Sequence, residues 1–415
     1  MAAGGPVRRW LVNAVRRRVW FVERTFDALR RYVASWTGTD RPRSVAAFDG
    51  WTNGTTLRCG GRVLATPPAG PVRADDSAWT NLRRAWFAWN SREVSGVRVR
   101  LTLPTPGRPN DAAPFVAEAV SDEEGYVFFD VAVDPPPPPG PHAATLDLPD
   151  HPDVRAGLTV FAADDADGPG LISDIDDTVL HTGVTSVWTT LRLTFFGNAQ
   201  TRQRLPGVAE LYRQIVATAD PKGPAGTCPA FYVSSSPWNL HGLLRGFFAA
   251  NRLPAGPLLL QDYGVDAVKL VTDLSHTHKL DAARKIVDDF PKRRFVLMGD
   301  SGQRDASLYA TLAEERPGRI AAVLIRDVDP LRPGRRDAAA TRELARLADA
   351  GVPALLAGDS VTMAGHLVRC GLLDAAAVAA VTRAQADDRD RPSLTRAAAA
   401  GAVGLGSPPG PTVAS

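Results

Sequence analysis

From residue 168 onward, short apolar runs alternate with longer segments of helical periodicity. Strands and helices in that alternation build a parallel sheet with helices on both faces. We therefore predict a doubly wound α/β domain, whose ligands gather at the carboxyl ends of its strands. The predicted strands are 170–174, 230–234, 295–299, 320–325 and 353–357. The predicted helices are 208–219, 240–250, 280–290, 306–315, 338–350 and 361–370.

Residues 45–162 carry a different pattern, in which short segments alternate apolar and polar side chains between turn clusters. Period-two alternation predicts an antiparallel β-sandwich ahead of the α/β domain. Its predicted strands are 56–64, 97–103, 115–120, 126–133 and 143–148. A Trp- and Arg-rich segment, 77–92, fits packing beneath this sheet better than nucleic-acid stacking, because no basic stripe continues into the strands. We predict no nucleic-acid partner.

The two ends of the chain differ from its middle. Residues 6–36 form a predicted helix with an apolar stripe and arginines on its other faces. Such a helix can lie on an anionic membrane surface, or its stripe can dock on the chain's own second domain. Residues 384–415 show little apolar periodicity, which predicts a disordered tail. The predicted organisation is thus helix 1–40, β-sandwich 41–166, α/β domain 167–383 and tail 384–415.

Composition bounds the class of protein. The 415 residues are 44% hydrophobic, enough for an ordinary globular core. No run of about 18 uncharged apolar residues occurs, and arginines interrupt the N-terminal apolar stretch, which argues against a membrane span or a signal peptide. The three cysteines lie too far apart for a disulfide framework or a zinc site. These features predict a cytoplasmic protein, peripheral on the inner membrane face if the N-terminal helix binds lipid.

Two carboxylates, Asp174 and Asp176, stand two residues apart where the first predicted α/β strand ends. This spacing suits phosphoryl transfer, in which Asp174 attacks phosphorus to give an aspartyl phosphate and Asp176 protonates the leaving oxygen. The backbone carbonyl of Asp176 can help hold a divalent cation, and Thr178 would stabilise the loop. Alone, the run also fits an Asx turn. A calcium loop fits poorly, because position twelve is Thr185 instead of Glu.

Two further segments can bind a phosphoryl group. Ser234 ends the second predicted strand, so its hydroxyl and the amide of Ser235 can donate to phosphoryl oxygens, although the same run also fits a helix cap. Lys279, one of five lysines, begins the helix that leads to Phe290. A cation there would neutralise Asp174 and the transferring phosphoryl group. As an isolated residue it would be a solvated surface lysine.

The third predicted strand is followed by another acidic pair, Asp300 and Asp305. Carboxylate oxygens that converge with Asp174 and Asp176 at one edge of a sheet suit Mg²⁺, which prefers hard oxygen ligands and keeps several waters. Gly299 permits the tight loop between the two acids. We therefore predict Mg²⁺ as the cofactor.

Taken together, the Asp-x-Asp-x-Thr block, Ser234, Lys279 and the Gly-Asp-x4-Asp run resemble the four signature motifs of the haloacid dehalogenase (HAD) superfamily of phosphatases. More specifically, Ile-Ser-Asp-Ile-Asp-Asp-Thr-Val, Tyr-Val-Ser-Ser-Ser-Pro-Trp and Gly-Asp-Ser-Gly-Gln-Arg-Asp resemble the phosphatidate phosphatases of the actin-patch-protein type and their bacterial relatives. The resemblance spans about residues 170–375, and the preceding sandwich also resembles that family's N-terminal region.

The resemblance implies a HAD-like Rossmannoid fold and a phosphoric monoester hydrolase with every catalytic position filled. It implies that Asp174 is nucleophile and metal ligand, and that Asp176 is acid and base. Ser234 and Lys279 would bind the phosphoryl group, with Asp300 and Asp305 at the metal.

The segment between the first two motifs bears on the substrate. Its apolar run, 184–196, is too short for a large cap domain, and Arg202 follows it. An open site suits a phosphorylated lipid with its headgroup near Arg202, although the run also fits the packed core of a flap. The leading function is Mg²⁺-dependent hydrolysis of phosphatidate to diacylglycerol. The alternatives are a phosphatase of a soluble or protein phosphomonoester, and a lipid-surface binding protein with a vestigial phosphatase domain.

Overall fold

The computed structural model describes residues 42–66, 93–104, 113–163, 168–175, 205–219, 228–261, 274–302, 304–328 and 335–390. Several predicted features lie outside these residues. They are the N-terminal helix 6–36, the Trp-rich segment 77–92, the run 184–196, and the site residues Asp176, Thr178 and Arg202. No helix among the described residues is long and apolar enough to cross a bilayer.

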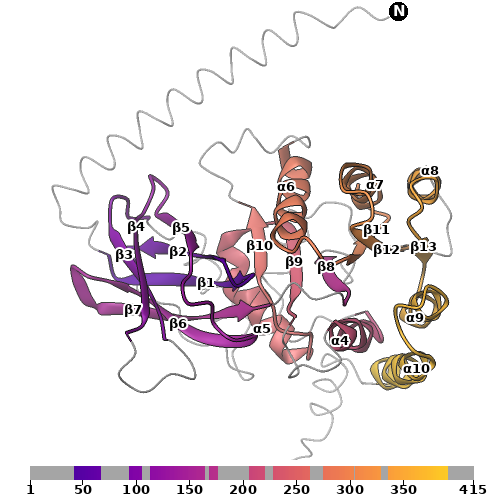
Figure 1. The fold of residues 1–415 in the computed structure, drawn as a ribbon, viewed down its shortest axis with the longest axis horizontal. Coiled ribbons are helices and arrows are strands. Elements are labelled where there is room, and N and C mark those ends of the chain that lie inside the picture. The colour runs from indigo at the N-terminus through magenta and orange to yellow at the C-terminus, as the bar shows by residue number, and fades with distance from the viewer. Residues whose placement is uncertain are drawn as a thin grey trace, which may run out of the picture.

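The N-terminal part is one mostly antiparallel sheet of seven described strands in the order β4-β3-β6-β7-β1-β2-β5 (Figure 1). The strands are β1 (Ser44–Thr52), β2 (Thr56–Leu64), β3 (Arg98–Leu103), β4 (Phe115–Val120), β5 (Tyr126–Ala132), β6 (Gly140–Leu148) and β7 (His151–Ala162). Only β1 and β7 pair in parallel among these strands. The edge strands β4 and β5 contact each other, so the sheet curls into a near-barrel around its core. The predicted antiparallel β domain is confirmed.

The C-terminal part is a parallel sheet of six described strands in the order β10-β9-β8-β11-β12-β13. The strands are β8 (Gly170–Asp174), β9 (Ala230–Pro237), β10 (Leu258–Gln261), β11 (Phe295–Asp300), β12 (Ile320–Arg326) and β13 (Ala354–Ala357). The helices are α4 (Val208–Thr218), η2 (Trp238–Leu240), α5 (His241–Ala250), α6 (Leu274–Asp289), α7 (Asp305–Glu315), α8 (Arg335–Asp349), α9 (Ser360–Arg369) and α10 (Ala375–Asp390). The predicted α/β domain is confirmed.

Helices cover both faces of this parallel sheet. Figure 1 shows α6, α7 and α8 on one face and α4, α9 and α10 on the other, where α5 also packs. The inner strands are buried on both sides, and every residue of β8, β11 and β12 is buried. This explains why these strands read as continuous apolar runs in the sequence instead of alternating.

The predicted tail boundary at residue 383 is wrong for the first residues beyond it. Helix α10 continues through Asp390, so residues 384–390 are helical. The periodicity here is weak because the helix is largely alanine and buries only Ala377, Val381 and Gln385. A narrow contact stripe of one alanine, one valine and one glutamine gives little hydrophobic signal.

The near-barrel is fastened to the α/β domain through β1. The indole Nε1 of Trp51 donates to Asp289 Oδ2 at 2.8 Å, and Arg58 donates from Nε and Nη2 to the same carboxylate at 2.8 and 2.9 Å. Phe48 stacks on Trp238 with ring centroids 4.2 Å apart. All residues of β1 from Phe48 to Thr52 are therefore buried, which removes the alternation that would have predicted this strand.

Replacing Asp289 by Ala should destabilise the chain by about 2–3 kcal/mol, because the Trp51 and Arg58 donors would lose a charged acceptor. Its side chain is 8% exposed and that of Arg58 17% exposed, so water cannot fully replace the lost bonds. Urea unfolding measures the change. The exposed Arg98–Asp150 pair is a suitable control, and Asp150→Asn should change stability by less than about 1 kcal/mol. Equal losses for the two variants would contradict the proposed role of this contact.

Candidate active site

Two acidic residues end neighbouring parallel strands. In the register of β8 and β11, Ser173 lies opposite Met298, so Asp174 and Asp300 follow at the same edge of the sheet. A tight loop then returns the chain to Asp305, the first residue of α7. Any other residue at position 299 would place its Cβ atom 2.6 Å from the Cβ of Asp305. This close approach explains why glycine occupies this position.

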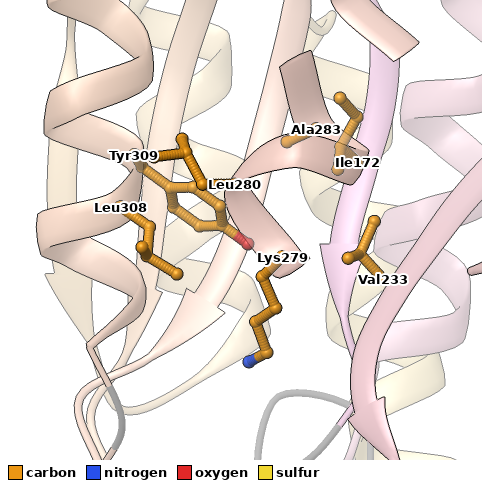
Figure 2. A pocket seen from close by; sticks show the side chains of 7 residues that line it. All are labelled: Ile172, Val233, Lys279, Leu280, Ala283, Leu308 and Tyr309. Atoms are coloured by element: carbon orange, nitrogen blue, oxygen red, sulfur yellow. The ribbon is translucent and has the colours of Figure 1, made fainter. Parts of the chain in front are cut away.

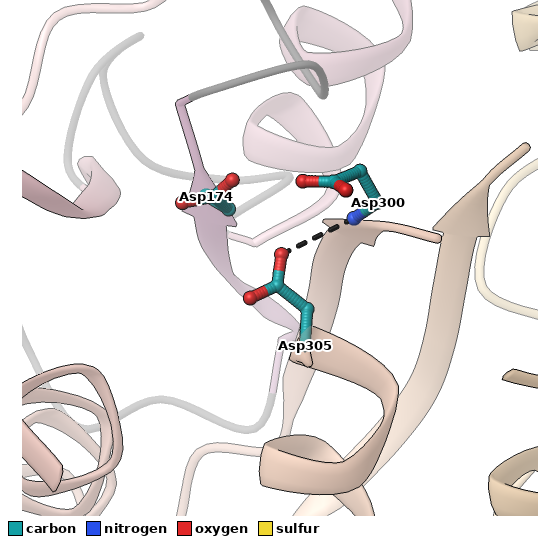
Figure 3. A group of neighbouring side chains, drawn as sticks. All are labelled: Asp174, Asp300 and Asp305. Atoms are coloured by element: carbon teal, nitrogen blue, oxygen red, sulfur yellow. Dashed lines mark hydrogen bonds between the residues drawn. The ribbon is translucent and has the colours of Figure 1, made fainter. Parts of the chain in front are cut away.

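The three carboxylates form a buried cluster (Figure 3). One oxygen of each of Asp174, Asp300 and Asp305 lies within 4.8 Å of the others, and the residues are at most 1% exposed. The backbone amide of Asp300 donates to Asp305 Oδ2 at 3.2 Å, which fixes the orientation of that carboxylate. The predicted acids Asp174, Asp300 and Asp305 thus meet at one point.

Lys279 reaches the same cluster. Its Nζ lies 2.7 Å from Asp174 Oδ1 and 3.0 Å from Asp305 Oδ1, and the side chain is 6% exposed. Burial alone would lower the pKa of Lys279, but the carboxylates of Asp174, Asp305 and Asp300 raise it well above its ordinary value. The ammonium is therefore charged at any working pH. The reading of this residue as an isolated surface lysine is wrong.

The helix that carries Lys279 begins earlier than predicted. Helix α6 starts at Leu274, so Lys279 lies in its second turn instead of at its beginning. The first turn is polar and lacks the apolar spacing that marks a helix in sequence.

Apolar side chains surround the stem of Lys279. They line a small cavity together with the lysine and come from β8, β9, α6 and α7 (Figure 2); they are Ile172, Val233, Leu280, Ala283, Leu308 and Tyr309. The phenol of Tyr309 donates to the carbonyl of Met298 at 2.8 Å, which fixes that ring. A methylene stem packed in apolar surroundings while its charged end reaches polar groups is typical of a buried lysine. The packing aims the ammonium at the carboxylates.

Ser234 lies on β9, the strand on the other side of β8. Asp174 is paired with Val233, so Ser234 is one residue further toward the same sheet edge. Its Oγ accepts a hydrogen bond from the amide of Ser236 at 2.9 Å, and its side chain is buried. Strand β9 continues to Pro237, so Ser234 does not end it and does not cap a helix. Ser235 is partly exposed on the same segment.

The donor set fits a hard divalent cation. Three carboxylates with one ammonium leave a formal charge of two negatives in a buried site, which is costly without a cation. All the clustered ligand atoms are carboxylate oxygens, the type that Mg²⁺ and similar ions take. The cluster therefore supports a metal site, and its chemistry alone does not name the metal.

Some residues around the site gave no sequence signal. Tyr309 packs with the stem of Lys279, and Tyr212 contacts Ser173 beside the nucleophile candidate. Both tyrosines lie in helices, where the sequence pattern predicts only that an aromatic side chain packs in the core. The position of Ser173 beside the site could be predicted, because it directly precedes Asp174. Its contact with Tyr212, 39 residues away, could not.

The segment that holds this site is similar to a known protein family. The family model described as phosphatidate phosphatase APP1, catalytic domain, matches residues 169–327. Phosphatidate phosphatase APP1 of Saccharomyces cerevisiae is 36% identical over 159 residues, which make up 38% of this chain and 26% of that protein. An uncharacterized protein of Schizosaccharomyces pombe is 26% identical over 175 residues, 42% of this chain and 28% of that protein. The chain thus spans little more than a quarter of these curated relatives.

The similarity to solved structures is low. A structure of PhoD is 8% identical, with a TM-score of 0.24 over 68% of this chain and 70% of that one. The sequence match is more informative, because its residues include the buried acidic cluster and Lys279. Over residues 169–327, the chain is therefore similar to the APP1 phosphatidate phosphatase catalytic domains, a family of phosphomonoester hydrolases.

Proposed function

We propose that this chain is a Mg²⁺-dependent phosphatase that hydrolyses phosphatidate to diacylglycerol through an aspartyl phosphate. The observation that carries the proposal is the buried Asp174, Asp300 and Asp305 cluster, which Lys279 contacts through Asp174 and Asp305, inside the segment that matches the family. A nucleophilic carboxylate, a cation and a set of metal ligands are what phosphoryl transfer to a protein carboxylate needs.

The proposed reaction has two steps. Asp174 attacks phosphorus, the phosphorus bond to the ester oxygen breaks, and Asp176 gives that oxygen its proton. Water then attacks the aspartyl phosphate with Asp176 as base, which releases phosphate and restores Asp174. Lys279 and the hydroxyl of Ser234 stabilise charge on the phosphoryl oxygens, with Ser235 and Thr178 as further contacts. A bound Mg²⁺, held by Asp174, Asp300, Asp305 and the Asp176 carbonyl, would neutralise further phosphate charge.

The identity of the substrate as phosphatidate is the more specific claim. It is supported by the name of the yeast relative, a phosphatidate phosphatase. Arg202 would contact the headgroup, and the predicted helix 6–36 would hold the protein on the anionic inner face of a membrane. Sedimentation with anionic liposomes, with and without residues 1–36, tests that attachment. Equal sedimentation would contradict it.

Phosphate release from a matched pair of substrates tests the function. Phosphatidate in mixed micelles and glycerol 3-phosphate carry the same phosphomonoester, with and without acyl chains. We expect Mg²⁺-dependent release from phosphatidate, strong preference over glycerol 3-phosphate, and no release in EDTA. Preference for the soluble ester would favour the alternative of a soluble-phosphomonoester phosphatase. Inactivity on both would support the alternative of a lipid-surface binding protein.

Metal binding can be tested apart from turnover. Saturating Mg²⁺ should stabilise the wild type by about 2–3 kcal/mol, seen as a rise in melting temperature. Asp300→Asn should melt no lower than wild type in EDTA, because it relieves repulsion among buried carboxylates, yet it should gain much less from Mg²⁺. Asp150→Asn, in an exposed pair, is the control and should respond like wild type. An undiminished Mg²⁺ response in Asp300→Asn would exclude this metal site.

A further inference from the structure

A chain of two hydroxyl groups lies directly behind Asp174. The hydroxyl of Ser173 donates to the backbone carbonyl of Asp174 at 2.6 Å. The same Ser173 Oγ lies 2.6 Å from the phenol oxygen of Tyr212. Because a hydroxyl has one proton and Ser173 has used it, Tyr212 must be the donor in this second bond. The direction of the chain is therefore Tyr212 to Ser173 to Asp174.

The two hydroxyl groups and Asp174 are enclosed by the protein. Tyr212 and Ser173 have no exposed surface, and Asp174 is 1% exposed. Burial raises the pKa of Tyr212 further above its ordinary value, so the phenol keeps its proton at any working pH. Water cannot replace either partner at such a site, and each bond is hard to lose without leaving a buried polar group unpaired.

The helix that holds Tyr212 is itself fixed at its start. The hydroxyl of Ser360 donates to the carbonyl of Pro206 at 2.9 Å and accepts from Arg326 Nη2 at 3.0 Å. The amide of Gly207 donates to Asp388 Oδ2 at 2.9 Å. Side chains of α9 and α10 therefore hold the beginning of α4, and Arg326 of β12 fixes the α9 serine, so Tyr212 presents its phenol to Ser173 from a fixed position.

We propose that Tyr212 and Ser173 are positioning residues for the nucleophile. Asp174 is the last residue of β8. The hydrogen bond from Ser173 to the carbonyl of Asp174 restrains the backbone angle ψ of Asp174. The backbone angles in turn limit which rotamers its side chain can adopt. The proposal rests on the proposed function, since it assigns Asp174 the attack on phosphorus. A misaligned nucleophile costs rate more than substrate affinity.

The fold offers a matched control tyrosine. Tyr232 is also fully buried, its phenol donates to the carbonyl of Pro254 at 2.9 Å, and its ring lies 6.4 Å from that of Tyr212. Tyr212→Phe and Tyr232→Phe therefore delete the same atom and the same kind of bond in one core. Only the first deletion reaches Asp174.

Steady-state kinetics on phosphatidate separates the two variants. Tyr212→Phe should lower kcat by roughly ten- to a hundredfold with KM within about twofold of wild type. Tyr232→Phe should keep kcat within about twofold. Ser173→Ala should behave like Tyr212→Phe, and Ser173→Thr, which keeps the hydroxyl, should restore most of the rate. Equal kcat in Tyr212→Phe and Tyr232→Phe, or in Ser173→Ala and Ser173→Thr, would overturn the inference, and the serine pair decides it if Tyr212→Phe does not fold.

A second readout separates this inference from the proposed function. Wild-type inactivity on both substrates would mean that the function is wrong. The Mg²⁺ dependence of the melting temperature then decides the positioning, because Asp174 is also a proposed metal ligand. Tyr212→Phe should need several-fold more Mg²⁺ than Tyr232→Phe for half of the rise. The same half-saturation in both would overturn the inference.

Discussion

Replacing Asp174 by Asn is expected to lower phosphate release by at least about a thousandfold, because an amide cannot attack phosphorus as a carboxylate does. The substitution keeps the size of the side chain and removes one of three clustered negative charges, so the fold should survive. Phosphate release in Mg²⁺ measures the loss, and the melting temperature in EDTA verifies folding.

The control for this substitution is Asp349→Asn, at the exposed end of α8. It makes the same chemical change away from the site and should leave turnover unchanged. Metal-dependent release by Asp174→Asn within tenfold of wild type would assign the attack on phosphorus to another group. A binding-only protein, by contrast, would show no release in either variant.

Lys279→Met should be damaging in two ways. Methionine matches the unbranched stem that packs in the apolar cavity but lacks the ammonium that contacts Asp174 and Asp305. We expect turnover to fall by about a hundred- to a thousandfold, since the charge proposed to stabilise the transition state is gone. In EDTA the variant should also be less stable by about 3–5 kcal/mol, because buried carboxylates lose their cation.

Mg²⁺ should recover part of that stability in Lys279→Met, since a divalent ion compensates the same carboxylates. Lys285→Met, on the same helix but 46% exposed and paired with Asp130, is the matched control and should change stability by less than about 1 kcal/mol. Urea unfolding in EDTA and in Mg²⁺ measures the change in stability of each of the two variants relative to wild type under both conditions. A stability loss no larger for Lys279 than for Lys285 would contradict the electrostatic role.

The pH dependence of this contribution follows from the raised pKa of Lys279. A group whose folded-state pKa exceeds its unfolded value of about 10.4 stabilises the fold fully below that value. The stabilisation is lost only as the pH rises through the higher folded-state pKa. The difference between wild type and Lys279→Met should therefore stay constant from about pH 6 to 9.

The sequence was sufficient to predict those site residues that lie at the ends of strands. Asp174 and Asp300 each follow an apolar run, and parallel strands must bring such ends to one edge. Lys279 was harder, because a single lysine has no pattern, and its burial depends on cavity walls from four separate elements. Strand β1 was missed because the near-barrel and the α/β domain bury it from both sides.

The hydroxyl chain behind Asp174 depends on tertiary contacts alone. Nothing in the sequence around Tyr212 differs from an ordinary amphipathic helix, and only the packing of α4 on β8 brings its phenol to Ser173. Polar contacts of this kind join residues far apart in the chain, so no local periodicity reports them.

The bond between Gly207 and Asp388 bears on where the catalytic domain can be cut. Gly207 has a φ of 76°, offers no side chain of its own to cap α4, and instead gives its amide to a carboxylate of the last described helix. A fragment ending at residue 383 would contain the proposed nucleophile Asp174, Lys279 and the other clustered acids. It would nevertheless lose the anion at the start of α4, where the helix dipole favours one. A fragment that keeps this contact must therefore extend at least through Asp388.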